Sequence, residues 1–256
     1  MNILVTAGGT GEKIDHVRSI TNLSTGRLSR IVAETLAARD ETERILYVCG
    51  ERALRPRCEK AEVFPVGGAA DLAETVTALC QRHRIDAIIH AMAVSDYSVR
   101  TVSTCGALAE SALSLLGAAE NAGLAADASR AALRDAFLRA EGFPRDGKIP
   151  SDVDDLVILL QRTPKVISML RGLAPRSVLI GFKLLDGVTE AQLIETAQAL
   201  LLRNDCDFVL ANDLRQISGA AHVGHLLGRD GRYTTYGDKE AIAHGIAEAL
   251  FHGREA

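Results

Sequence analysis

The polar residues that could carry chemistry stand where predicted strands end, or in the long segment after the first strand. They combine amides, lysines and acids: Asn22, Asp96, Lys148, Lys183, Asn212 and Asp213. The sequence contains no serine nucleophile elbow, HExxH motif, Walker A motif or Cys/His cluster. Amide, lysine and backbone donors with few bases suit chemistry in which the substrate supplies the nucleophile. Phosphoryl or nucleotidyl transfer is of this type, because positioning and charge stabilisation supply most of the catalysis.

One stretch, Ala91 to Tyr97, combines small residues with an acid and an aromatic residue. It follows the apolar run 85–90, which is typical of a buried strand in a parallel sheet. Ligands bind at the carboxyl ends of such strands, and small side chains let them approach the backbone. Asp96 as the N-cap of a helix is the structural alternative.

A glycine-rich turn, Gly8-Gly9-Thr10-Gly11, follows the first predicted strand and could hold phosphate on its backbone N–H groups. The spacing does not fit the dinucleotide fingerprint, because Ile14 stands where a third Gly or Ala is required. Helical periodicity begins only after Ser24-Thr25-Gly26, so a long loop separates the strand from its helix. This helix start is a second candidate anion site, or a plain cap.

The elements that must position these residues alternate between strands and helices. Strands are predicted over 2–6, 44–49, 62–66, 85–90, 178–184 and 208–211, with helices between most of them. The segment 156–160 could be strand or helix, and its β-branched residues and length favour a strand. This order predicts an α/β fold with a Rossmann-like, doubly wound, mostly parallel sheet. Residues 98–147 are expected to form a helical insertion or flap, and residues 222–234 a C-terminal hairpin. We expect one nucleotide-binding domain over residues 1–256.

Composition excludes several classes of protein. Apolar residues make up 47% and charged residues 24% of the 256 residues, which is ordinary for a soluble α/β protein. The net charge of -4 gives no basic surplus for nucleic acid or anionic membrane. Five cysteines without metal spacing predict reduced thiols, no metal site and a cytoplasmic location. No signal peptide or membrane span is predicted.

Several of these motifs resemble those of a known family. Five segments resemble the N-terminal motif of phosphopantothenoylcysteine synthetase: Gly8-Gly9-Thr10, Ile14-Asp15, Val17-Arg18, Ile20-Thr21-Asn22 and Ser24-Thr25-Gly26. Later segments match in order, namely Ala91 to Tyr97, Lys148-Ile149, Thr163-Pro164-Lys165, Gly181-Phe182-Lys183-Leu184 and Ala211-Asn212-Asp213-Leu214. Together they cover residues 2 to about 215 and look most like the stand-alone bacterial form.

The resemblance implies a ligase of coenzyme A biosynthesis. The carboxylate of 4'-phosphopantothenate attacks the α-phosphate of CTP, with Mg²⁺ assisting, and gives an acyl-cytidylate and pyrophosphate. The amine of cysteine then displaces CMP. The resemblance also implies a homodimer with small-molecule partners only. ATP could replace CTP, as in eukaryotic relatives, and the decarboxylase domain of fused relatives is not expected in a chain that starts at the first strand.

The family's site residues carry over to positions of this sequence. The resemblance implies catalytic parts for Asn22 and Lys148, with Arg18 orienting the first loop; a surface ion pair is the alternative for Arg18. It implies nucleotide binding by Gly8, Gly9, Thr10, Ser24, Gly26, Phe182, Lys183, Asn212 and Lys165. A solvated lysine at a helix start is the alternative for Lys165. It implies substrate binding by Asn22, Ala91, Met92, Ala93 and Asp96.

Two other functions remain open from the sequence. A Rossmann-type NAD(P)-dependent oxidoreductase would explain the glycine turn, but it needs a compact fingerprint and an acid where the second strand ends in Val48-Cys49-Gly50. A pantothenate- or nucleotide-sensing module without catalysis is the third hypothesis.

Overall fold

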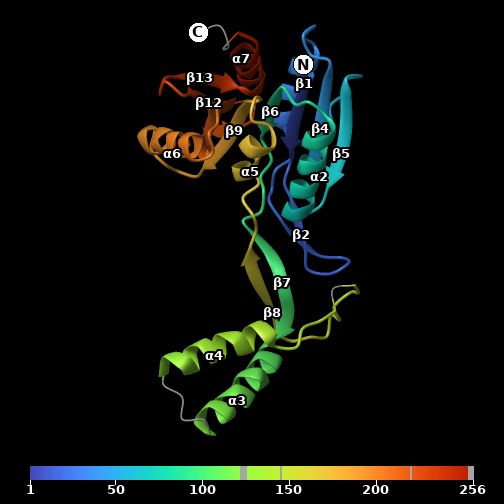
Figure 1. Ribbon diagram of the computed structural model, residues 1–256, viewed down its shortest axis with the longest axis vertical. Helices are drawn as coiled ribbons and strands as arrows, with labels where there is room; N and C mark the ends of the chain where they lie inside the picture. The colour runs from blue at the N-terminus through green and yellow to red at the C-terminus, as the bar shows by residue number, and fades with distance from the viewer. Residues whose placement is uncertain (122–125, 145, 220, 253–256) are drawn as a thin grey trace. The chain divides into compact units, whose positions relative to one another are not determined.

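We describe the protein in a computed structural model, which covers residues 1–121, 126–144, 146–219 and 221–252 (Figure 1). The chain forms two compact units, which we describe separately. The first comprises Met1–Gly11, Thr21–Ser95 and Pro164–Ala256, and the second comprises Glu12–Ile20 and Asp96–Thr163. The second unit is larger than the expected insertion, because it also takes in part of the segment after the first strand. The division into one domain with an insertion stays a prediction.

The first unit is built on a nine-stranded, mostly parallel sheet. Its parallel strands are β1 (Asn2–Ala7), β4 (Arg44–Gly50), β5 (Ala61–Val66), β6 (Ala87–His90), β9 (Val178–Leu185) and β10 (Phe208–Asp213). Three antiparallel strands follow at one end: β11 (Ile217–Ser218), β12 (Ala221–Gly228) and β13 (Tyr233–Asp238). The order is β11-β12-β10-β9-β6-β1-β4-β5, with β13 on β12. The Rossmann-like sheet and the C-terminal hairpin are thus confirmed.

The strand order reverses beside β1. From β1 the chain first builds outward through β4 and β5, and then returns to place β6, β9 and β10 on the other side of β1. The carboxyl ends of β1 and β6 therefore flank the switch point of the sheet, where open α/β sheets bind ligands. The glycine turn follows β1 and the 91–95 segment follows β6.

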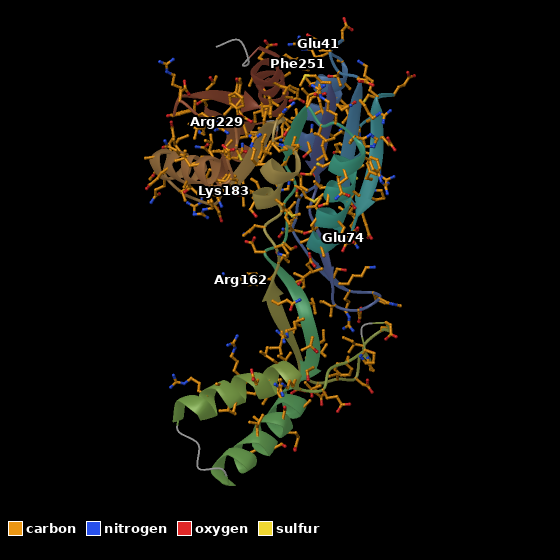
Figure 2. All side chains as sticks on the ribbon, in the orientation of Figure 1. Glu41, Glu74, Arg162, Lys183, Arg229 and Phe251 are labelled. Carbon is orange, nitrogen blue, oxygen red and sulfur yellow. The ribbon has the colours of Figure 1, made fainter. Side chains whose placement is uncertain are left out.

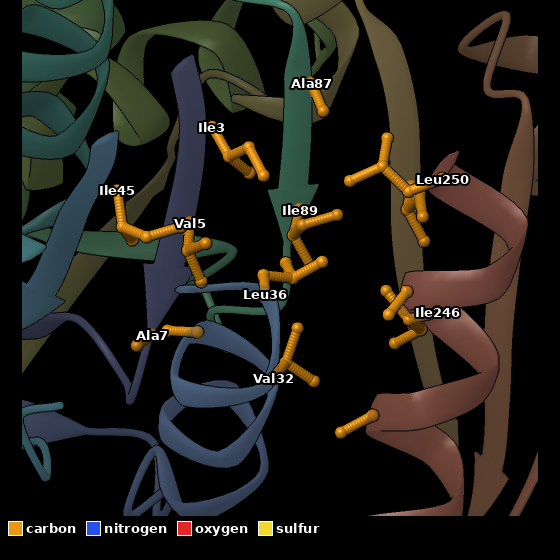
Figure 3. Close-up of a cluster of buried hydrophobic side chains, with 14 of the residues drawn as sticks. Ile3, Val5, Ala7, Val32, Leu36, Ile45, Ala87, Ile89, Ile246 and Leu250 are labelled. Carbon is orange, nitrogen blue, oxygen red and sulfur yellow. The ribbon is translucent and has the colours of Figure 1, made fainter. Parts of the chain in front are cut away.

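Helices cover both faces of this sheet. Helices α1 (Arg27–Ala37) and α7 (Lys239–His252) pack on one face, and α2 (Ala69–Arg82), α5 (Ile167–Leu173) and α6 (Glu190–Arg203) pack on the other. Figure 3 shows the first core, where Val32 and Leu36 of α1 and Ile246 of α7 meet strand residues such as Val5. A short 3₁₀ helix, Leu214–Gln216, follows β10.

Local sequence sets the starts of two of these helices. Thr189 and Gln192 form a capping box at α6, in which each side chain bonds the other's backbone N–H. Asp238 Oδ1 accepts the Ala241 N–H at 2.7 Å and so caps the start of α7. None of the helices among the described residues is long and apolar enough to cross a membrane.

The second unit contains an antiparallel pair, β7 (Tyr97–Thr104) and β8 (Leu156–Arg162). Helices α3 (Cys105–Asn121) and α4 (Ala126–Arg139) lie between them in sequence, which confirms the helical part of the insertion expected over 98–147. Residues 98–104 were also expected in this helical insertion but belong to strand β7, because they pair with β8. A small core of Val99, Val102 and Ile149 holds the unit together. Asp96 precedes a strand, so its alternative as a helix cap is wrong. In the segment after β1, β2 (Gly11–Lys13) pairs with β3 (Ser19–Thr21).

Candidate functional site

The glycine turn is packed so tightly that three of its contacts exclude a side chain. Gly8 has a φ of 77°, and a Cβ there would lie 2.5 Å from the Ala53 Cβ. A Cβ on Gly9 would lie 2.6 Å from the Asn22 carbonyl oxygen, and one on Gly50 would lie 2.2 Å from the Gly9 carbonyl oxygen. Glycine is therefore required at the turn and at the end of β4 for steric reasons.

The N-terminus of α1 returns to this turn. Gly26, with a φ of 70°, is the N-cap, and a Cβ there would lie 3.0 Å from the Gly8 nitrogen. No side chain caps the helix at this residue. Thr25 Oγ1 accepts the Arg27 N–H at 3.4 Å. A helix N-terminus whose N-cap residue is a glycine, set beside a glycine turn, favours a bound anion. Ser24 lies just before this helix in the sequence, and its N–H donates to the Asn22 carbonyl at 2.9 Å.

The segment after β6 is fastened along the glycine turn. The Ala93 N–H donates to the Gly8 carbonyl at 2.8 Å, and the Thr10 N–H donates to the Ala93 carbonyl at 3.2 Å. The Thr10 hydroxyl accepts the Ser95 N–H at 2.8 Å and donates to Ser95 Oγ at 2.9 Å. Thr10 and Ser95 are both buried. The two segments thus continue the pairing of β1 with β6 beyond the strands.

A buried histidine and a threonine hydroxyl support the segment that follows β6. Thr6 Oγ1 lies 3.0 Å from His90 Nδ1 and accepts the Met92 N–H at 3.1 Å. Burial lowers the pKa of His90 to about 4, so the imidazole is neutral. The Met92 side chain lies in the core, which leaves only backbone atoms of this residue near the edge.

Asn22 is brought to this edge although it lies far from Ala93 in sequence. Its Nδ2 donates to the Ala93 carbonyl at 2.9 Å, while its backbone lies against Gly9. The residue is exposed, and the structure therefore joins Asn22, Gly9 and Ala93 in one place. Its role stays a prediction. Ala91 and Ala93, both partly exposed, line the same edge.

Phe182 and Lys183 lie at the carboxyl end of β9, just beyond the pairing of Gly181 with His90. Phe182 packs on the core that contains α1 and α7. Because side chains alternate along a strand, Lys183 belongs to the opposite face, with α5 and α6 (Figure 2). The two residues can reach one ligand only from opposite faces of the sheet.

Asn212 and Lys165 complete the predicted nucleotide set. Asn212 is buried, and its Nδ2 donates to the Val223 carbonyl at 2.7 Å, so its amide group supports β12. Its neighbour Asp213 accepts the N–H groups of Gly187 and Val188 and fixes the loop after β9. These backbone hydrogen bonds hold the pKa of Asp213 below its usual range. Lys165 is exposed just before α5.

Arg18, Asp96 and Lys148 belong to the second unit. Arg18 forms an ion pair with Asp15, in which Nε and Nη2 both donate to Oδ2 at 2.9 and 2.6 Å. Asp96 is exposed, and its carbonyl accepts the Thr163 N–H at 3.0 Å. The Lys148 side chain is also exposed.

Several residues of this site escaped the sequence reasoning. Ala53 and Gly50 pack on the glycine turn, and Ser95 and Thr6 hold the 91–95 segment. The available signals were weak, namely a glycine at the end of a strand and hydroxyl residues beside motif residues. In the part of the chain that the structure describes, no group of three or more His, Cys, Asp or Glu residues could hold a metal ion.

Comparisons with known proteins show the family to which the chain belongs and the proteins that share its fold. The family model described as the DNA/pantothenate metabolism flavoprotein C-terminal domain matches residues 1–115 and 107–252. The coenzyme A biosynthesis bifunctional protein CoaBC of Thermococcus kodakarensis is 26% identical over 228 residues, which is 89% of this chain and 45% of that protein. The chain thus spans less than half the length of this curated relative.

Solved structures show the same fold. The DNA/pantothenate metabolism flavoprotein of Streptococcus pneumoniae is 34% identical, with a TM-score of 0.77 over 98% of both chains. A mutant of Cab2 in complex with phosphopantothenate-cysteine is 13% identical, with a TM-score of 0.66 over 100% of this chain and 89% of that one. At that identity the second likeness concerns the fold alone.

Proposed function

This chain belongs to the family of the DNA/pantothenate metabolism flavoprotein C-terminal domain, and on that premise we propose that it is a phosphopantothenate–cysteine ligase of coenzyme A biosynthesis. Relatives named as coenzyme A biosynthesis proteins support this. The Cab2 structure, whose fold this chain shares, holds phosphopantothenate-cysteine, the compound that the proposed reaction would form.

One observation in the first unit carries the proposal. The glycine turn, the α1 N-terminus at Gly26 and the Asn22 amide meet at the switch point of the sheet. Backbone N–H groups and a helix N-terminus suit the phosphates of a nucleotide. An amide beside them suits a carboxylate or acyl group. A site that holds both can place a carboxylate against a phosphate.

The first step joins these two ligands. A carboxylate oxygen of phosphopantothenate attacks the α-phosphorus of the nucleotide, and the bond to the bridging oxygen breaks, which releases pyrophosphate. In our proposal Gly8, Gly9, Thr10, Ser24 and Gly26 hold the phosphates, with Lys165 and Lys183 as positive charges and Phe182 beside the base. Asn22 orients the carboxylate while its Nδ2 is held by the Ala93 carbonyl. Positioning and charge stabilisation are the chain's main contribution.

The second step forms the amide. The cysteine amine attacks the acyl carbon, the bond to the nucleotide phosphate breaks, and the amine loses a proton as the nucleoside monophosphate leaves. In our proposal the Lys148 ammonium neutralises charge on the departing phosphate, and Asp96 contacts the substrate.

Mg²⁺ is the expected companion of the nucleotide. Because the described residues contain no carboxylate cluster that fits the ion, we derive no step through a protein-held metal. The ion would arrive with the triphosphate, since Mg²⁺ commonly binds substrate phosphates and keeps several waters.

CTP is our proposed nucleotide, with ATP as the alternative. An NAD(P)-dependent oxidoreductase needs an acid at the end of its second strand. Here that strand, β4, ends in Gly50, whose α-carbon faces the Gly9 carbonyl, so this position does not support the oxidoreductase. The sensing module keeps the same ligands but lacks turnover, so the assay below separates it from the ligase.

We further propose a cytoplasmic homodimer with small-molecule partners only. The described cysteines are all free thiols, as in reducing compartments. The β7–β8 pair is a two-stranded sheet whose β8 exposes Leu156 and Leu160. Such a pair is marginal alone, and an apolar edge strand suits association with a second copy. Light scattering should give twice the chain mass, and a monomer would contradict the dimer.

The decisive assay follows pyrophosphate. Purified protein receives phosphopantothenate, cysteine and Mg²⁺ with CTP or with ATP. We expect continuous pyrophosphate release with one nucleotide, and a stoichiometric burst when cysteine is omitted. No pyrophosphate with either nucleotide would reject the ligase.

Asn22→Asp tests the amide within that assay. The variant replaces an N–H donor by an oxygen facing the Ala93 carbonyl, so we expect a loss of about 10²-fold in turnover with the fold intact. Asn204→Asp is the matched control, because Asn204 Nδ2 also donates to a backbone carbonyl, that of Leu200, at 2.9 Å. Unchanged turnover in Asn22→Asp would remove Asn22 from the site.

A further inference from the structure

The backbone around Lys148 is fastened to the turn Asp15–Arg18, within the second unit. The Ile149 N–H donates to Asp15 Oδ2 at 3.2 Å, and Arg18 Nη2 donates to the Ile149 carbonyl at 3.0 Å. The N–H and the carbonyl of Ile149, the residue after Lys148, are therefore held by Asp15 and Arg18, which also form an ion pair with each other.

The N-terminal side of Lys148 is held as well. The His16 N–H donates to the Gly147 carbonyl at 3.3 Å. Peptide groups on both sides of Lys148 thus have partners in the same turn, while the lysine side chain is exposed. A lysine on such a backbone sweeps a much smaller volume than one on a free loop.

Asp15 divides its two oxygens between two tasks. Oδ1 accepts the Val17 N–H at 2.8 Å and the Arg18 N–H at 2.7 Å, which forms the turn itself. Oδ2 accepts Arg18 Nε at 2.9 Å and Nη2 at 2.6 Å, together with the Ile149 N–H. Of the two Asp15 oxygens, Oδ2 is the one that accepts a hydrogen bond from the lysine segment.

The surroundings make this connection firm. The Asp15 side chain is fully buried, and Ile149 is buried with Val99 and Val102. The Arg18 guanidinium holds the pKa of Asp15 far below its usual range, so the group is a carboxylate at any pH at which an enzyme works. Charge-assisted hydrogen bonds are the stronger class of hydrogen bond.

We propose that Asp15 is a positioning residue that acts through Ile149 and Arg18 to hold the Lys148 ammonium for the second step. This rests on the proposed function, which gives Lys148 its part in the reaction. Fixing a charged group before the substrate arrives removes part of the ordering that each turnover would otherwise require. The lysine segment and the 15–18 turn then move together as one piece.

Asp15→Asn tests this at the level of single atoms. The amide keeps an oxygen for the turn, and it replaces Oδ2 by an NH₂ group that cannot accept from Arg18 or Ile149. Asp207→Asn is the matched control, because Asp207 also pairs with an arginine and accepts a backbone N–H, that of Leu179, in the first unit. If Asp15→Asn does not fold, Arg18→Lys is the second variant, because it keeps the charge but gives up the paired Nε and Nη2 donors to Oδ2.

Two readouts separate position from fold. The first is trypsin cleavage after Lys148, followed by mass spectrometry of the fragment that starts at Ile149. We expect cleavage at least about tenfold faster in Asp15→Asn and unchanged in Asp207→Asn. The second is turnover, with kcat about 10²-fold lower and the KM for the nucleotide little changed in Asp15→Asn.

A double variant shows whether the effect passes through Lys148. On a Lys148→Gln background, Asp15→Asn should lower kcat by no more than about threefold, because the group it positions is gone. A full additional loss would overturn the proposal, as would unchanged cleavage, or faster cleavage with normal turnover. A wild-type protein without ligase activity would overturn the proposed function, and with it the role of Asp15. That failure is distinguishable, because it is seen before any variant is made.

Discussion

Replacing Gly8 by alanine tests the glycine turn through two separable effects. The residue has a φ of 77°, a conformation that costs an L residue about 1–2 kcal/mol. The new Cβ would also lie 2.5 Å from the Ala53 Cβ, and overpacking of this kind costs about 1–3 kcal/mol. Gly8→Ala should therefore lower the free energy of unfolding by about 2–5 kcal/mol.

Ala53→Gly should remove the steric part and leave the backbone strain. Without the Ala53 methyl group, the next contact is the Ala53 Cα at 3.5 Å, which is ordinary van der Waals distance. Ala53→Gly alone should cost less than about 1 kcal/mol, mainly through unfolded-state entropy. The double variant should then be more stable than the sum of the two changes by about 1–3 kcal/mol.

Urea unfolding of the wild type, the two single variants and the double variant, monitored by circular dichroism, measures this coupling. The slopes of unfolding free energy against urea concentration are compared among the four proteins. Titration calorimetry with nucleotide measures the site directly, and Gly8→Ala should weaken binding at least about tenfold, or 1.4 kcal/mol. Strict additivity within about 0.5 kcal/mol would refute the contact between Gly8 and Ala53. A stable Gly8→Ala protein with normal nucleotide affinity would refute the tight turn altogether.

Two further predictions concern the support of the same edge. Thr10→Val removes the hydroxyl that accepts the Ser95 N–H and should lower the free energy of unfolding, measured in urea, by about 1–3 kcal/mol. Thr10→Ser keeps the hydroxyl and should lose much less. Equal losses in the two variants would show that the hydroxyl is not the cause. Burial lowers the pKa of His90 from 6.5 to about 4, so the unfolded chain binds a proton first as pH falls. The contribution of the neutral His90 to the free energy of unfolding is complete above pH 6.5 and is lost as the pH falls toward 4, by about 1.4 kcal/mol per pH unit. In His90→Gln the free energy of unfolding should change less between pH 6.5 and pH 4. Identical pH profiles of the variant and the wild type would refute the burial argument.

The fold was largely readable because its signals are local and repeated. Apolar runs such as 85–90 and 178–184 predict buried parallel strands, and each became a strand of the sheet. The segment 156–160 is also a strand, but it pairs with β7 in the second unit, since an apolar run does not specify its partner. Asp96 could not be assigned from local sequence, because the same residue type suits a cap and a strand end.

The candidate site was predictable only in its parts. The motifs named Asn22 and the 91–93 segment, yet nothing in the sequence set the Asn22 amide against the Ala93 carbonyl. The signal that could have pointed to Asp15 was its spacing from Arg18, but its bond to Ile149 depends on a segment more than a hundred residues later. Residues without polar groups, such as Ala53, carry no sequence signal for a site at all.

The sequence by itself determined which residues form strands and helices, where glycine is placed and which motifs recur in a known family. These follow from periodicity, turn chemistry and residue type, which act over a few residues. The tertiary structure alone decided that the α1 N-terminus returns to Gly8 and that Ala53 and Gly50 close the turn. It also decided that the lysine segment is fastened to the Asp15 turn. These contacts join residues far apart in sequence, and they form only where the packing of the sheet and helices brings them within hydrogen-bond or van der Waals distance.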